Sequence, residues 1–139
     1  MMGEIMKNLN WSIIISSLVA IIGWGIGYYI TNDQIQKAKQ KEVITGYLVE
    51  AYRKIEDVCA RDSLTNEQKR NVEKAVADIQ LFGTSNQIKL TKEFTEEMNK
   101  NSFSDPRKLL IILRNDLRIE LGIEPASIDF NDIIHWRLK

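Results

Sequence analysis

Proline, cysteine and histidine are scarce in this chain. Its 139 residues include two prolines, Pro106 and Pro125, and one cysteine, Cys59. A single cysteine excludes an intramolecular disulfide and suits a reducing compartment, where a lone thiol more often packs as a small apolar group than reacts. The few prolines and the seven glycines, three of them clustered at 23, 25 and 27, favour long helices over a turn-rich β fold.

An excess of charge of either sign is also missing. Lys and Arg total 19, as do Asp and Glu, so we expect no nucleic-acid partner. The sole histidine, His135, cannot form a His-rich metal site, and neither Cys-x-x-Cys nor His-Glu-x-x-His spacing occurs. No Gly-rich loop precedes a Lys-Ser or Lys-Thr pair, and nothing orients Cys59 and His135 as nucleophile and base. The sequence therefore predicts a non-enzymatic protein without catalytic residues, metal or cofactor.

A long uncharged run stands near the N-terminus. Trp11 to Ile30 comprises twenty residues without a charged side chain or a proline, and nine of them are Ile, Leu or Val. A helix of this length covers about 30 Å, the thickness of a bilayer hydrocarbon core, and its aliphatic residues favour insertion by about 3–5 kcal/mol in total. Trp11 at one end, with Tyr28 and Tyr29 at the other, suits the two membrane interfaces. We therefore expect a transmembrane helix over residues 11–30.

The charges around this run predict its orientation. Lys37, Lys39 and Lys41 follow it, whereas only Lys7 precedes it. The positive-inside rule then places the following residues in the cytoplasm and the N-terminus outside, in a single-pass protein. Two alternatives stay open, a buried helix of a soluble core and a signal peptide cleaved near residues 25–27.

Small residues follow one face of the expected span at spacings of four, four, three and four. They are Ser12, Ser16, Ala20, Gly23 and Gly27. Such a stripe lets two helix backbones approach closely, which drives association inside lipid. The stripe therefore predicts a helix–helix interface with a second copy or with another membrane helix.

The rest of the chain divides by helical periodicity. We expect a short N-terminal tail over 1–10, the span over 11–30, a polar stalk over 31–43, a helical bundle over 44–123 and an amphipathic tail over 124–139. The stalk and the first bundle helix form one helix over about 33–61, started by capping chemistry at 31–33. Its core-facing residues are Ile44, Leu48, Ala51, Ile55 and Val58, flanked by Tyr47, Tyr52 and Cys59.

Three more helices are predicted by their starts and stops. Thr65 with Gln68 forms a capping box, and the helix that follows buries Val72, Ala75, Val76, Ile79 and Phe82 before Gly83 ends it. The next begins at Ser85 and turns Ile88, Phe94 and Met98 inward. The last helix has Ser104 or Asp105 as its cap and Pro106 in its first position, and it ends at Gly122. Its buried residues are Leu109, Leu110, Leu113, Leu117 and Leu121.

The expected fold class is all-α: one N-terminal transmembrane helix and a small bundle of four to five antiparallel helices.

Two regions are candidates for a partner surface. Arg114 and Arg118 share a helix face that would suit an acidic partner or a phosphate, although a solvated face is the plainer reading. In the tail, Trp136 and Arg137 stand in an amphipathic segment that would lie on a membrane or a partner, or fold back over the bundle.

The segments Ile79-Gln80-Leu81-Phe82-Gly83 and Leu109 to Pro125 resemble small bacterial single-span membrane proteins of uncharacterised function with a helical cytoplasmic domain. This resemblance implies the cell inner membrane and supplies no catalytic residue. The sequence as a whole predicts a membrane-anchored interaction module that binds an unknown cytoplasmic protein. The alternative is a self-associating membrane effector or regulator, such as a phage-defence or exclusion component.

Overall fold

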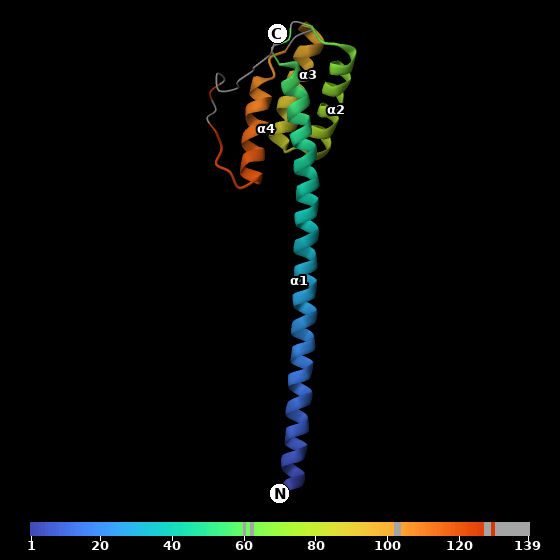
Figure 1. Cartoon of the computed structure of the whole chain (residues 1–139), viewed down its shortest axis with the longest axis vertical. Coiled ribbons are helices and arrows are strands. Elements are labelled where there is room, and N and C mark those ends of the chain that lie inside the picture. The colour runs from blue at the N-terminus through green and yellow to red at the C-terminus, as the bar shows by residue number, and fades with distance from the viewer. Residues whose placement is uncertain (60, 62, 102–103, 127–128, 130–139) are drawn as a thin grey trace. The chain divides into compact units, whose positions relative to one another are not determined.

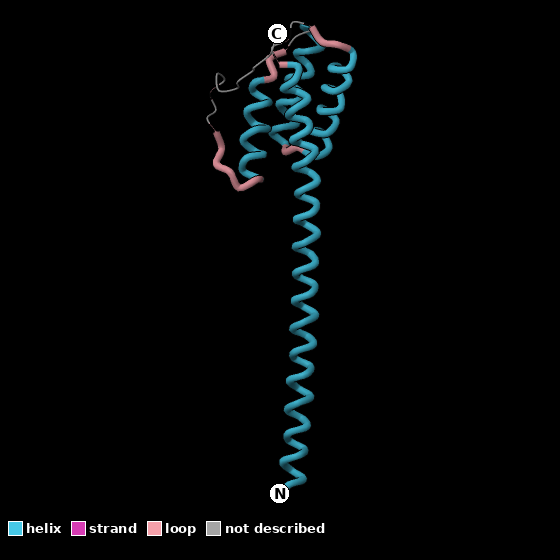
Figure 2. The backbone as a smooth tube through the Cα atoms, viewed as in Figure 1, coloured by secondary structure: helices cyan, strands magenta, loops and turns pink. Residues whose placement is uncertain are grey.

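The described part of the chain is helical. The structure, a computed structural model, describes residues 1–59, 61, 63–101, 104–126 and 129, without the side chains of 5–9. Its helices are α1 (Met2–Val58), α2 (Asn66–Phe82), α3 (Ser85–Asn101) and α4 (Arg107–Glu120), and no strand occurs among these residues (Figure 2). The predicted all-α fold with a small bundle is confirmed.

The chain forms two compact units, Met1–Lys41 and Glu42–Lys139, and α1 contributes to both. The prediction of a separate helix from about residue 33 was wrong, because α1 continues through 31–33. Thr31 Oγ1 donates to the Gly27 carbonyl oxygen at 2.8 Å, within the same helix, instead of capping a new one. A threonine can bond backwards in this way when the backbone around it stays helical.

The first unit holds the apolar run. The large apolar side chains between Trp11 and Ile30 are exposed by 49–77%, and the most apolar window of α1 contains no buried residue. By length and composition this helix is able to cross a membrane, a property that signal sequences and buried core helices share. The structure thus contains one long apolar N-terminal helix compatible with a membrane span.

The second unit is an antiparallel bundle of residues 42–58 of α1 with α2, α3 and α4 (Figure 1). Gln68 Nε2, in the first turn of α2, donates to Asp57 Oδ2 at 3.1 Å, near the C-terminal end of α1. At the other end of the same pair, the rings of Tyr47 and Phe82 stack with centroids 4.8 Å apart. Gln87 Nε2, in the first turn of α3, donates to Asp116 Oδ2, in the last turns of α4, at 2.7 Å.

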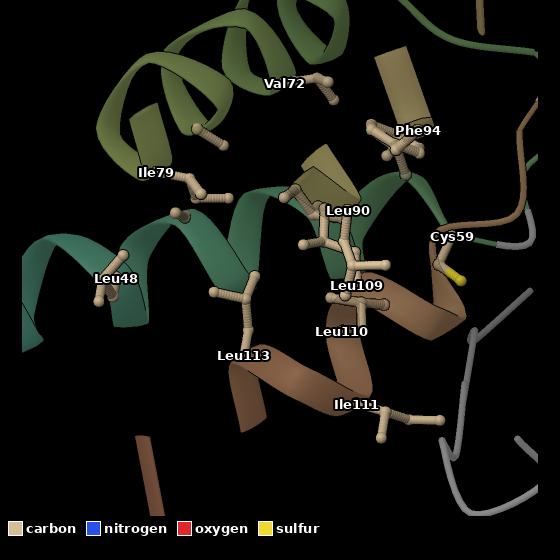
Figure 3. Close-up of a cluster of buried hydrophobic side chains, with 14 of the residues drawn as sticks. Leu48, Cys59, Val72, Ile79, Leu90, Phe94, Leu109, Leu110, Ile111 and Leu113 are labelled. Atoms are coloured by element: carbon tan, nitrogen blue, oxygen red, sulfur yellow. The ribbon is translucent and has the colours of Figure 1, made fainter. Parts of the chain in front are cut away.

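All four helical segments contribute to one apolar core (Figure 3). Its fully buried aliphatic side chains include Ile55, Ile79, Leu109, Leu110 and Leu113. Each buried Leu or Ile stabilises the fold by about 1.5–3 kcal/mol relative to an exposed one. Most predicted core residues are confirmed as buried or packed against the core, with the following buried besides those above: Leu48, Ala51, Val58, Cys59, Val72, Ala75, Phe94 and Leu117.

Four residues of the predicted core-facing stripes are exposed: Ile44, Tyr47, Ile88 and Leu121. In α3 the inward face carries Gln87, Leu90, Thr91 and Phe94, so Ile88 lies outside it. Gln87 takes that place because it bonds both to Asp116 and to the start of its own helix. Leu121 follows the last residue of α4, where the chain leaves the helix.

Polar residues fix the helix ends largely as predicted. The Thr65–Gln68 capping box is present. A second box, which we did not predict, starts α3: Gln87 N donates to Thr84 Oγ1, and Thr84 N donates to Gln87 Oε1. Pro106 lies just before α4 rather than in its first position, while Asp105 Oδ1 accepts from the Arg107 backbone N–H at 3.1 Å. Such caps stabilise a helix by about 1 kcal/mol each.

Two glycines are required where helices end. At Gly83 an added Cβ would lie 2.5 Å from the Ile79 carbonyl oxygen, so no other residue fits without a backbone shift. Gly122 has φ +72°, the left-handed conformation that disfavours other residues. Its N–H donates to the Ile119 carbonyl oxygen and that of Ile123 to the Arg118 carbonyl oxygen, which is a Schellman motif.

Candidate functional site

No group of three or more His, Cys, Asp or Glu side chains within the described residues could hold a metal ion. Cys59 is buried in the core, and His135 lies outside the described residues. The candidate sites in the second unit are therefore surfaces and a cavity.

The first candidate is a set of exposed apolar side chains on segments near one end of the bundle, which we call the base. The exposed large apolar side chains described in the second unit all lie here: Val43, Ile44, Tyr47, Leu81, Ile88, Ile119, Leu121 and Ile123. The stacked rings of Tyr47 and Phe82 connect residues 42–58 of α1 to the end of α2. The Gln87–Asp116 hydrogen bond joins the start of α3 to the end of α4. Leu81, with 74% of its surface exposed, is the most open of the set.

The second candidate is a cavity of about 730 Å³ towards the opposite end of the bundle. Its walls are mostly apolar and come from α1, α2 and α3, with Pro106 just before α4; they include Val58, Val72, Val76, Phe94 and Met98. Arg61, Lys69 and Glu73 add charged groups to the lining. A volume in this range is typical of sites that take up a small molecule or a cluster of apolar side chains.

The predicted Arg114 and Arg118 pair lies on the half-buried flank of α4. Arg118 Nε donates to the Glu124 carbonyl oxygen at 2.7 Å, so its guanidinium holds the turn that follows the helix. Arg114 is close enough to Tyr52 to influence its ionisation. Burial raises the pKa of the Tyr52 phenol above its ordinary value of 10.0, and the positive charge of Arg114 opposes this shift.

The other predicted site residues belong to the first unit or to the tail. The stripe of Ser12, Ser16, Ala20, Gly23 and Gly27 is exposed, and no atom lies within 4 Å of a Cβ built on Gly23 or Gly27. The predicted interface aromatics Trp11, Tyr28 and Tyr29 are also exposed. Trp136 and Arg137 lie outside the described residues.

Sequence reasoning missed the base and the cavity. The base combines residues near the ends of α2, α3 and α4 with residues inside α1, and the cavity walls come from α1, α2 and α3. Neither therefore follows from the period of one helix. A partial signal was present in α4, where Ile119 falls outside the seam of leucines. Large apolar residues off a core-facing seam are worth testing as contact residues.

Comparisons of the chain with protein-family models, with curated proteins and with solved structures found no match. The similarity to small bacterial single-span membrane proteins therefore stays an interpretation of the sequence.

Proposed function

We propose that this protein is a membrane-anchored, non-enzymatic interaction module. In this proposal the apolar part of α1 crosses the cell inner membrane. The second unit lies in the cytoplasm and binds a partner protein through its base.

One observation carries the proposal: the first unit buries none of its large apolar side chains from Trp11 to Ile30, whereas the second unit has an apolar core. The helix from Trp11 to Ile30 is apolar on every side and its large side chains are exposed, while the second unit has a core of its own. A helix that is apolar all round is found either inside a protein core or inside a membrane. Exposed apolar surface costs about 25 cal/mol per Å² in water, so this segment needs lipid or protein around it.

The flanking charges support the orientation. Lys37, Lys39 and Lys41 follow the apolar run, and Lys37 Nζ pairs with Asp33 Oδ2 at 2.8 Å. Lysines count toward the positive-inside bias even where acidic residues accompany them. The presence of a single cysteine, which excludes an intramolecular disulfide, suits the reducing cytoplasm as well.

The base suits a protein better than a lipid surface. Its exposed side chains are aliphatic with one tyrosine, which is the character of a protein contact surface. Glu42, Glu120 and Glu124 stand beside them in the chain and are exposed. Carboxylates at this rim would be repelled by the anionic cytoplasmic leaflet.

The runner-up function is a self-associating membrane effector. The open space around Gly23 and Gly27 supports it, because a second span could approach these backbones closely. The two functions differ in what must bind: a second copy through the stripe, or a different protein through the base.

The first experiment tests the anchor. Membranes that contain the full chain are extracted with alkaline carbonate, and the intact mass of the retained protein is measured. We expect the uncleaved chain to stay in the pellet. Ile22→Lys should release it, because a lysine at the centre of the span costs about 3–4 kcal/mol relative to isoleucine. Gln36→Lys, outside the run, is the matched control and should not release it. A wild-type chain that is extracted, or that lacks its first residues, would refute the anchor.

The second experiment tests the base. The full chain is purified from membranes in mild detergent together with whatever it binds, and the components are identified by mass spectrometry. We expect Leu81→Glu to lose a stoichiometric partner that Asn101→Glu, an exposed change of equal charge beyond the base, retains. Gly27→Leu should also retain it. Recovery of the chain alone, as an oligomer that Gly27→Leu disrupts, would favour the effector instead.

A further inference from the structure

The cavity of about 730 Å³ in the second unit is lined by one face of α2 and one face of α3. These lining residues are Lys69, Val72, Glu73 and Val76 on α2, and Phe94, Thr95, Met98 and Asn99 on α3. Residues 83 and 84 alone connect the two packed helices, so α2 and α3 run antiparallel. The first turn of α2, with Lys69, therefore lies beside the last turn of α3, with Asn99. Val76 and Phe94 lie further along the same two faces.

The end of the cavity at the first turn of α2 is polar. Arg61 is fixed there by Asp57, since its Nε donates to the Asp57 carbonyl oxygen at 2.6 Å and its Nη2 donates to Asp57 Oδ1 at 2.8 Å. Gln68, next to Lys69 in the chain, donates to the other carboxylate oxygen of Asp57 at 3.1 Å. The two cationic side chains of the described lining, Arg61 and Lys69, therefore belong to one end of the cavity.

These two cations are suited to a bound anion. The bonds to Asp57 leave further N–H groups of the Arg61 guanidinium available, and no ion pair joins the Lys69 ammonium to another described residue. A guanidinium that is already held in one orientation loses little freedom when it binds a carboxylate. Glu73 is the carboxylate of the described lining, which therefore carries two cations and one anion, a net charge of +1.

The part of the cavity further along the two helices is mostly apolar. Val72 and Phe94 are buried, and Val76 and Met98 pack against the shared core. Thr95 Oγ1 donates to a carbonyl oxygen of its own helix at 2.9 Å, so a neighbouring alkyl chain would not leave this donor without a partner. An alkyl chain between these side chains would be removed from water, which is favourable.

We propose that this cavity binds a single-chain amphipathic anion, of which a fatty acid is the simplest example. The carboxylate accepts from Arg61 and Lys69, and the alkyl chain lies between α2 and α3 against Val72, Val76 and Phe94. The cavity volume falls within the range of roughly 300–1,000 Å³ that small-molecule sites occupy. This inference does not rest on the proposed function, because the cavity and the base share no residue.

Nuclear magnetic resonance of the methionine methyl groups tests the proposal in the full chain. Met98 lines the cavity, whereas the other three methionines precede the apolar run and report uptake of ligand by the lipid. The chain is labelled with ¹³C at these methyl groups, held in nanodiscs of zwitterionic lipid, and titrated with octanoate or with octylammonium. These two ligands share one alkyl chain and carry heads of opposite charge.

We expect octanoate to shift the Met98 signal to saturation, with a Kd at least about five-fold lower than that of octylammonium, because its head meets two cations. Hexanoate, shorter by two methylenes, should bind about ten-fold more weakly than octanoate. Octylammonium that binds as tightly as octanoate, or a Met98 shift that does not saturate, would overturn the proposal. Both outcomes are read on the wild-type chain, so they do not depend on the folding of a variant.

Substitutions in α2 then locate the head of the ligand. Lys69→Gln should weaken octanoate binding by about five-fold and remove the preference over octylammonium. Lys74→Gln, an exposed change of equal charge on the same helix but outside the lining, is the matched control and should bind octanoate like the wild type. Glu73→Gln should tighten octanoate binding, because it removes a like charge from the lining. Equal octanoate binding by the Lys69→Gln and Lys74→Gln proteins would refute the proposed site.

Discussion

The second unit of this chain buries an apolar core, whereas the first unit leaves its large apolar side chains exposed. In Met1–Lys41 the large side chains from Trp11 to Ile30 lie open, and glycines at 23, 25 and 27 have no neighbouring atoms within 4 Å of an added Cβ. In the second unit the aliphatic side chains of four helical segments share one core, and Gly83 lies against a carbonyl oxygen of its own helix. Both units are helical, so the difference lies in what surrounds the helices.

Because of this contrast, the same substitution should change stability differently in the two units. In the second unit a side chain contributes through packing against other parts of the chain, and its loss leaves a cavity. In the first unit the large apolar side chains from Trp11 to Ile30 are exposed, so the effect of losing one depends mainly on lipid or on a second helix.

The largest difference is expected for isoleucine-to-alanine changes. Ile79→Ala removes a fully buried side chain of α2 and should lower the free energy of unfolding of the second unit by about 2–5 kcal/mol. Ile22→Ala, at an exposed position of the first unit, should change it by less than about 0.5 kcal/mol. Hydrogen exchange of backbone amides in the detergent-solubilised chain measures both. Similar losses from the two changes would show that the units are not independent.

A smaller difference is expected for glycine-to-alanine changes. Gly83→Ala forces a Cβ against the Ile79 carbonyl oxygen, 2.5 Å away, and should destabilise the second unit by about 1–3 kcal/mol. Gly23→Ala meets no atom within 4 Å and replaces a poor helix former by a good one. Thermal unfolding followed by circular dichroism should show a lower midpoint for Gly83→Ala alone. A Gly83→Ala protein as stable as the wild type would contradict the close approach at this turn.

Much of the second unit could be predicted because its signals are local. The Thr65 and Gln68 pair marks the start of α2 three residues apart, and the leucine seam of α4 has the period of one helix. These features depend on neighbours within a turn or two, so one sequence suffices to find them.

The remaining features depend on contacts between distant residues. Gln87 is buried because it reaches Asp116, 29 residues later, and no pattern within α3 predicts that bond. Ile88 and Leu121 fit a helical seam on paper, yet other side chains occupy the core positions. The base shares this origin, since it combines the ends of α2, α3 and α4 with residues inside α1. Stripe residues such as Gly23 stay a prediction, because their partner would be another helix.

The smallest expected effect concerns the ionisation of Tyr52 in the second unit. It depends on burial of this side chain beside the apolar core. Burial raises its pKa in the folded state above the ordinary value of 10.0, with the opposing charge of Arg114 reducing the shift. Below pH 10 the phenol is protonated in both states and adds no pH dependence. As the pH rises through 10, the unfolded chain loses this proton first, so the folded state binds more protons and the free energy of unfolding falls. Tyr52→Phe should remove that part of the decline, which urea unfolding of wild type and variant between about pH 9 and 11 would measure. If the free energy of unfolding fell equally with pH in the two proteins, the Tyr52 hydroxyl would be as well solvated in the folded state as in the unfolded chain. The apolar core would then not extend to this side chain.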